Sequence, residues 1–184
     1  MKSLATGHDA ALNELMERHG QKLFHYLIRC LQSEDDAADA AQEAFLRVYQ
    51  NRAKFDASHQ FSTWLYTIAT NLVTDRYRHR ARHPEVSLDA PDAETRATLM
   101  QHLPDAQPTP EESLRLSERA ELVRKAIDRL PDDLRTALIL FDYEDRSHAE
   151  IGQILNCSAK AVETRLYRAR NILRERLSGM LPNI

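Results

Sequence analysis

The sequence predicts an all-α protein with two small helical domains joined by an acidic, proline-containing linker, the C-terminal one with a helix-turn-helix. Apolar residues recur every three to four positions through most of the 184 residues, which is the period of helices with one buried face. No segment shows the convincing alternation of a strand. Prolines and acidic residues gather in one central segment, and a short helical pattern, a turn and a longer basic helical pattern follow near the C-terminus.

Three helices are expected before the linker. An apolar stripe runs from Leu12 to Leu31, and Ser33 can cap the next helix by accepting a hydrogen bond from the backbone N–H of Asp36. The expected elements are a helix over 8–31, a helix that begins after Ser33, a loop over 54–60, and a helix from Phe61 that runs into a basic cluster at 76–82 and ends at Pro84.

The central segment separates two helical parts. Residues 84–108 contain four prolines and five acidic residues, which is typical of a linker. Helical order restarts where Thr109 can act as a cap and Pro110 can occupy the first turn. We therefore expect a domain over 1–83, a linker over 84–108 and a domain over 109–184.

Residues 147–176 predict the helix-turn-helix. Ser147 and Glu150 have the spacing of a capping box, in which each side chain bonds the backbone N–H of the other residue. Asn156 tolerates the left-handed backbone that a sharp turn requires. Small Gly152 allows the two helices to cross closely.

The second helix of this motif has an apolar face and a polar face. With Val162, Leu166 and Leu173 turned inward, polar residues face outward and arginines lie on the flanks, an arrangement that suits the major groove of DNA. A solvated helix in an ordinary bundle is the alternative. The candidate DNA-binding residues are Lys160, Glu163, Thr164, Arg165, Tyr167, Arg168 and Arg170.

Composition argues against catalysis. The four glycines form no phosphate-binding cluster, so neither a P-loop nor a Rossmann turn is expected. His79 and His83 are four residues apart, but the basic surroundings disfavour a metal cation. The net charge of −3 argues against a uniformly basic nucleic-acid-binding coat. We expect a protein that is not an enzyme and holds no cofactor and no metal.

The sequence also predicts a cytoplasmic protein without membrane insertion. No apolar run approaches the length of a membrane span, and the first ten residues lack the apolar centre of a signal peptide. Cys30 and Cys157 lie far apart in sequence and do not suggest a disulfide framework.

Four stretches together resemble a known family. They are DDAADAAQEAFLRVY at 35–49, FSTWLYTIATNLVTDRYR at 61–78, AIDRLPDDLRTAL at 126–138 and AEIGQILNCSAKAVETRLYRAR at 149–170. Their order and spacing resemble bacterial RNA polymerase sigma factors of the extracytoplasmic-function (ECF) group. The resemblance implies core RNA polymerase and promoter DNA as partners, with one domain for the −10 element and one for the −35 element. It also implies an anti-sigma factor that clamps both domains.

The resemblance assigns roles to two sets of residues in the first domain. An aromatic and basic path suits a single strand, because bases stack on rings while cations hold phosphates; Tyr66, Asn71 and Arg78 face away from the apolar stripe, whereas Trp64 lies on it. The implied −10 residues are Lys54, Phe55, Tyr66, Asn71, Arg76, Arg78 and Arg80. The implied polymerase-binding residues are Asp35, Asp39, Gln42, Glu43 and Arg47.

One position departs from the family pattern. Position 163 is often Lys or Arg in relatives and is Glu here. A carboxylate repels phosphate but accepts a hydrogen bond from the amino group of cytosine. We therefore expect a −35 preference unlike the common one.

Two other functions compete with a sigma factor. A stand-alone helix-turn-helix regulator binds duplex DNA tightly without polymerase, and an adaptor whose helices bind only protein has no effect at promoters. A sigma factor binds duplex weakly alone and directs promoter-specific transcription with core polymerase. Run-off transcription separates the three.

Overall fold

The regular secondary structure of the described residues is entirely helical. The structure, a computed structural model, describes residues 1, 4, 9–82 and 110–178, and the side chains of 110–117 are not described. The elements are α2 (Ala10–Leu31), α3 (Glu34–Gln50), the short 3-10 helix η1 (Arg52–Lys54), α4 (Phe61–Arg82), α6 (Pro110–Asp128), α7 (Asp132–Asp142), α8 (His148–Ile154) and α9 (Ala159–Ser178). These residues include no strand, and the all-α prediction is confirmed. The predicted linker over 84–108 lies outside the described residues.

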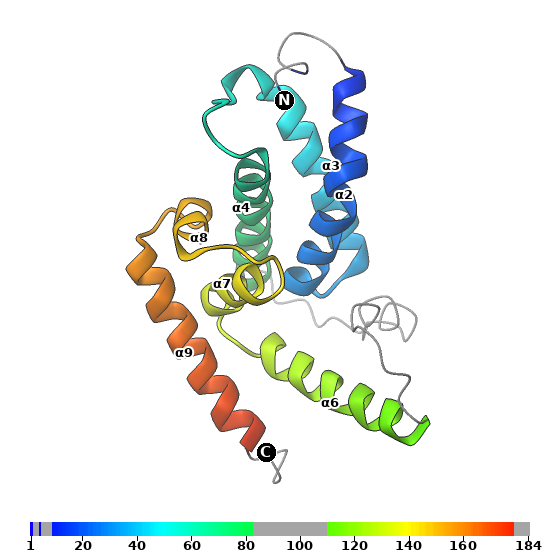
Figure 1. Ribbon diagram of the computed structural model, residues 1–184, viewed down its shortest axis with the longest axis vertical. Coiled ribbons are helices and arrows are strands. Elements are labelled where there is room, and N and C mark those ends of the chain that lie inside the picture. Colours follow the sequence, from blue (N-terminus) through cyan, green and yellow to red (C-terminus); the bar gives the residue numbers. More distant parts are fainter. Residues whose placement is uncertain (2–3, 5–8, 83–109, 179–184) are drawn as a thin grey trace.

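Helices α2, α3 and α4 pack together in the first half of the chain (Figure 1). Gln32 adopts a left-handed conformation with φ 59° and closes α2 by donating its backbone N–H to Ile28 O. The Ser33 hydroxyl then accepts from Asp36 N at 3.2 Å, as the sequence predicted. The buried faces of the three helices form this part of the core, which includes Leu23, Leu27, Leu31, Ala37, Ala40, Ala44, Val48, Leu65, Ala69 and Val73.

The helix-turn-helix is formed by α8 and α9, and its local signals are confirmed. Ser147 and Glu150 make both bonds of the capping box. Asn156 has φ 50°, and Cys157 N donates to Gly152 O at 2.8 Å, which closes the turn. The hydroxyl of Ser158 accepts from Ala161 N at 3.1 Å at the start of α9. Local capping and one left-handed residue therefore fix the sharp turn between the two helices.

The two halves of the chain also pack on each other. Helix α8 lies against α4, and α7 lies against α2 (Figure 1). One continuous core cluster includes buried residues of both halves. Arg135 of α7 is buried, donates to Asp128 O at 2.7 Å and stacks its guanidinium 4.9 Å from the ring centroid of Tyr77 on α4. The molecule is thus closed, with the helix-turn-helix half seated on the other half.

Candidate nucleic-acid and polymerase interfaces

The outer face of α9 carries the predicted readers. Val162, Leu166 and Ala169 are buried, which turns the opposite face to solvent. The side chain of Tyr167 is 68% exposed. The exposed residues of this face include Lys160, Glu163, Thr164, Tyr167 and Arg168. The helical wheel thus predicted their exposure correctly, and their binding to DNA stays a prediction.

Two of these readers are already paired with each other. Lys160 Nζ donates to Glu163 Oε2 at 2.8 Å, and this hydrogen bond lowers the pKa of Glu163. Thr164 Oγ1 donates back to Lys160 O at 2.9 Å. The pair presents an ionised carboxylate acceptor beside an ammonium donor on the exposed face. The carboxylate and the ammonium group together can accept and donate hydrogen bonds at base edges, whereas an unpaired carboxylate would repel the phosphates.

The flanking arginines are held by carboxylates of α7. Arg165 Nε lies 3.6 Å from Asp133 Oδ2, and Arg170 Nη2 lies 3.2 Å from Asp142 Oδ1. The guanidinium of Arg170 also stacks 5.2 Å from the Phe141 ring centroid. These contacts orient both side chains at the edges of α9, where phosphate oxygens flank a groove-bound helix.

We expect Glu163→Arg to change the preferred bases at one or two positions of the duplex site. The substitution removes a carboxylate, which can accept a hydrogen bond from the amino group of cytosine. It introduces a guanidinium group, which can donate two hydrogen bonds to guanine. The measurement is selection of bound sequences from a randomised duplex pool, made on the whole chain with core polymerase. Glu175→Arg, the same change at an exposed position farther along α9, is the control and should leave the preference intact. Identical base preference in all three proteins would remove Glu163 from the readers.

Some arginines at the basic end of α4 make contacts with the α2–α3 junction. Arg80 donates to Leu31 O at 2.9 Å and pairs with Asp36 at 2.5 Å, and Arg76 lies 3.7 Å from Asp36. These two arginines therefore tie the end of α4 to the α2–α3 junction. Arg78, whose side chain is 69% exposed, lies 3.7 Å from Asp75. Of the predicted −10 residues, Lys54, Asn71, Arg78 and Arg80 are exposed.

An aromatic cluster supports the loop that follows η1. Phe55 lies 5.1 Å from Trp64 and 6.3 Å from Phe61 between ring centroids. Trp64 is partly buried against the core, in keeping with its place on the apolar stripe. Asp56 accepts from Ser58 N at 2.9 Å, which shapes the tip of the loop. The loop thus presents exposed residues 56–60 beside a base of packed aromatic rings.

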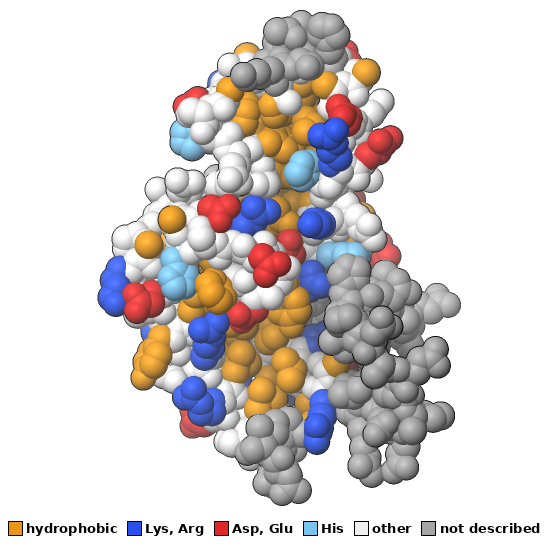
Figure 2. Space-filling model, viewed as in Figure 1, with side chains coloured by type: hydrophobic (Ala, Val, Ile, Leu, Met, Phe, Trp, Pro, Cys, Tyr) orange, Lys and Arg blue, Asp and Glu red, His pale blue; other side chains and the backbone are white. Residues whose placement is uncertain are grey.

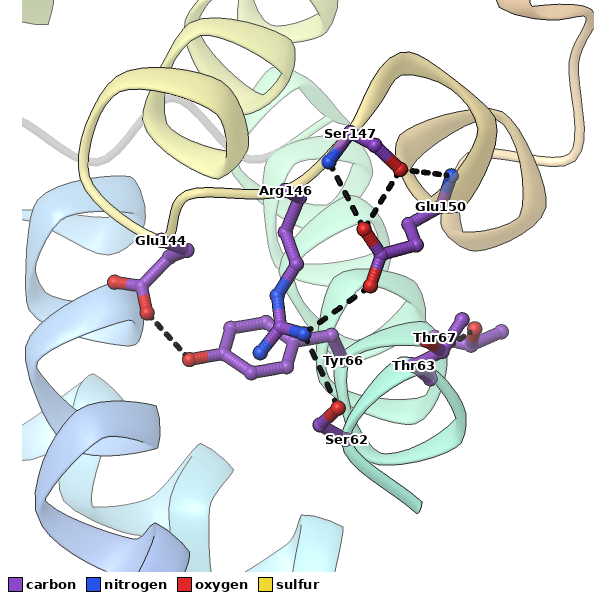
Figure 3. Close-up of polar contacts among 8 residues, drawn as sticks. All are labelled: Ser62, Thr63, Tyr66, Thr67, Glu144, Arg146, Ser147 and Glu150. Carbon is purple, nitrogen blue, oxygen red and sulfur yellow. Dashed lines mark hydrogen bonds and ion pairs between the residues drawn. The ribbon is translucent and has the colours of Figure 1, made fainter. Parts of the chain in front are cut away.

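The structure contradicts the predicted exposure of Tyr66. Its side chain is only 3% exposed, its ring lies 5.0 Å from the Tyr26 ring, and its hydroxyl donates to Glu144 Oε2 at 2.5 Å. Burial, followed by the nearby Glu144 charge, raises its pKa. The expectation was wrong because Tyr66 lies between Tyr26 of α2 and the residues Glu144 and Arg146 of the second half of the chain (Figure 3). A single-helix wheel contains no information about the residues of the second half that complete this burial.

The outer face of α3 holds the predicted polymerase-binding residues. Asp35, Asp39 and Gln42 are exposed, and Glu43 pairs with Arg47 at 2.8 Å. An open depression of about 510 Å³ is lined by Asp39, Gln42, Glu43, Leu46 and Arg76. Leu46 is 49% exposed and was not among the predicted residues. The sequence feature that could have identified Leu46 is its place as a large apolar residue on an otherwise polar helix face.

Positive and negative side chains are mixed on the described surface, which agrees with a local rather than a uniformly basic nucleic-acid-binding site. Figure 2 shows Lys and Arg side chains interspersed with Asp and Glu on the visible face of the described residues. Within the described ranges no cluster of three or more His, Cys, Asp or Glu is arranged to hold a metal, and Cys30 and Cys157 are free thiols. None of the described helices has the length and apolar character needed to cross a bilayer.

Comparisons with known proteins match both halves of the chain. The family model for sigma-70 region 2 matches residues 15–83, and that for sigma-70 region 4 matches 120–173. The chain is 36% identical to the ECF RNA polymerase sigma factor SigW of Bacillus subtilis, over 98% of this chain and 96% of that protein.

Two solved structures share the fold. The structure of CnrH in complex with the cytosolic domain of CnrY has a TM-score of 0.69 and 23% identity, over 97% of this chain and 94% of that one. The sigma factor RpoE in complex with the anti-sigma factor NepR, from Bartonella quintana, has a TM-score of 0.66 and 23% identity, over 90% and 96% of the two chains.

Proposed function

The chain belongs to the ECF sigma factors of the sigma-70 family, and we propose that it binds core RNA polymerase and directs initiation at promoters that carry −10 and −35 elements. The observation that carries this proposal is that models of both sigma-70 regions match one chain, which is also 36% identical to SigW over 98% of its length. Sigma factors are not enzymes in general, and we propose a non-catalytic role here, in the cytoplasm.

The two halves divide promoter recognition between them. We assign −35 recognition to a domain over 109–184, whose helix α9 presents Lys160, Glu163, Tyr167 and Arg168 to the major groove. The arginines at the edges of α9 then bind phosphates and set the register of the helix. This half supplies the sequence-specific grip on intact duplex.

The first half is assigned to the −10 element and to polymerase. A domain over 1–83 offers the exposed loop at 56–60, with Lys54, Asn71 and Arg78 as exposed polar groups for a melted strand. Polymerase docks on the outer face of α3, where the depression around Leu46 adds an apolar contact to the charged rim. Residues 84–108 link the two domains.

A protein partner that blocks these surfaces is also part of the proposal. The similar sigma factor RpoE was solved in complex with an anti-sigma factor, and the two halves of this chain, which shares its fold, pack on each other. We propose that this chain is likewise held inactive by an anti-sigma factor.

Run-off transcription with purified core polymerase tests the function. We expect the chain to raise specific transcripts from a pool of genomic promoter fragments by at least about tenfold over core enzyme alone, because core lacks its own promoter recognition. Duplex binding by the chain alone should be weak and salt-dependent. Tight, specific duplex binding without polymerase, with no gain in transcription, would instead identify a stand-alone helix-turn-helix regulator.

A further inference from the structure

Lys160 and Glu163 form an exposed ion pair near the start of α9. Their side chains are 80% and 55% exposed, and Lys160 Nζ donates to Glu163 Oε2 at 2.8 Å. Lys160 is the second residue of α9, and the Ser158 hydroxyl caps this end of the helix. In helix-turn-helix proteins the N-terminal residues of the second helix contact base edges. The pair therefore lies in the part of α9 that is best placed to contact bases.

Each member of the pair has more hydrogen-bonding capacity than their mutual contact uses. An ammonium group has three donors, and the one directed at Glu163 leaves two for bases. A carboxylate offers about four acceptor positions. The hydrogen bond from Lys160 lowers the pKa of Glu163, which keeps this side chain ionised and able only to accept. Thr164 donates its hydroxyl to Lys160 O at 2.9 Å, so this donor is not directed at the Glu163 carboxylate.

A G·C base pair matches this order of donors and acceptors along its major-groove edge. Guanine presents two acceptors, N7 and O6, and cytosine presents the donor N4 amino group. O6 and N4 are hydrogen-bonded to each other within the base pair, at a separation of about 2.9 Å. That separation is close to the 2.8 Å between Lys160 Nζ and Glu163 Oε2. The ammonium group can therefore donate to N7 and O6 while the carboxylate accepts from N4, with the ion pair intact.

The other base pairs fit the ion pair less well. In A·T and T·A pairs the adenine N6 amino group has an acceptor on each side, N7 and thymine O4, so a carboxylate that accepts from N6 also faces an acceptor. A C·G pair presents the G·C pattern in reverse, which places the ammonium group against the cytosine donor and the carboxylate against the guanine acceptors. The order of Lys160 and Glu163 along α9 therefore determines which strand carries the guanine.

We propose that Lys160 and Glu163 together recognise a single G·C base pair of the duplex −35 element, with the guanine on the strand nearer Lys160. The inference rests on the proposed function and deepens it, because it names the base pair that the start of α9 selects. It gives Lys160 a role in base selection rather than in phosphate binding. It also accounts for an acid at position 163, because Lys160 offsets the negative charge near the phosphates while the carboxylate accepts from cytosine.

The test exchanges the two residues in the whole chain. The double variant Lys160→Glu, Glu163→Lys reverses the order of donor and acceptor while the net charge and the spacing stay the same. Bound duplexes are selected from a randomised pool, by the chain with core polymerase and, in parallel, by the chain alone at low salt. We expect the wild type to prefer G·C at one position by about tenfold over each other base pair. The double variant should prefer C·G at that position, with the rest of the selected sequence unchanged.

Two further variants control the exchange. Glu14→Arg with Arg18→Glu exchanges an exposed ion pair on α2 and should leave the selected sequence unchanged. Glu163→Gln keeps the side-chain size but adds a donor to the acceptor, so it should weaken the preference for G·C without inverting it. Both exchanged positions of α9 are exposed, and a glutamate in the first turn of a helix is favourable, so the double variant should fold as the wild type does; circular dichroism checks this.

The outcomes separate this inference from the function on which it rests. A double variant that keeps the wild-type base pair at every selected position, or a wild-type selection without a G·C position, would overturn paired recognition. A chain that does not stimulate core polymerase, but alone selects a base pair that inverts with the exchange, would reject the sigma function and leave paired recognition standing.

Discussion

Gly152→Ala is expected to destabilise the helix-turn-helix half by about 2 kcal/mol. A Cβ on Gly152 would lie 2.7 Å from the carbonyl oxygen of Cys157, which is a backbone atom and cannot rotate away. The same turn depends on the 2.8 Å hydrogen bond from Cys157 N to Gly152 O, so relieving the overlap weakens the turn. Alanine is a better helix former than glycine by about 1 kcal/mol, and the expected loss is what remains after that gain.

Gly20→Ala is the matched control and should have the opposite sign. Gly20 is inside α2, and a Cβ built there meets no atom within 4 Å, so only the helix-forming gain of about 0.5–1 kcal/mol remains. Urea unfolding followed by circular dichroism measures both variants. Fluorescence of Trp64, the single tryptophan, reports the environment of α4 in the first half. An unchanged or higher midpoint for Gly152→Ala would contradict the close crossing of α8 and α9.

The helix-turn-helix was predictable from sequence because its determinants are local. The capping box of Ser147 and Glu150 and the left-handed Asn156 act within a few residues of one another, so their structure follows from spacing alone. The exposed face of α9 followed for the same reason, since a buried stripe of Val162 and Leu166 fixes the orientation of a helix.

The closed arrangement was not predictable in the same way. Tyr66 is buried by Glu144 and Arg146, residues about 80 positions farther along the chain, and no periodicity in α4 encodes them. Arg80 has a role that composition also hides, because it caps the end of α2 by donating to Leu31 O while pairing with Asp36. The arginines of a basic cluster that make structural contacts can thus be identified only when the tertiary contacts are known.

Leu46→Asp is expected to reduce transcription with core polymerase by about 30-fold, corresponding to about 2 kcal/mol of docking free energy. Leu46 is the large apolar side chain in the depression on α3, and such a residue ringed by polar groups is typical of the anchor of a protein interface. The side chain is 49% exposed in the free protein, so replacing it removes little core packing and should leave the unfolding free energy nearly unchanged.

Met16→Asp supplies the matched control, because Met16 is a similarly exposed apolar residue, at 42%, on α2. Met16→Asp should support transcription as the wild type does if the loss in Leu46→Asp comes from docking rather than from replacing an apolar side chain with a charged one.

Competition against labelled wild-type chain for a limiting amount of core polymerase measures docking directly. A Leu46→Asp protein that competes as well as wild type, but transcribes poorly, would move the defect from α3 to the DNA-binding surfaces. Equal losses in both variants would show a general effect of the added charge. Only selective loss of competition by Leu46→Asp supports α3 as the polymerase-binding helix.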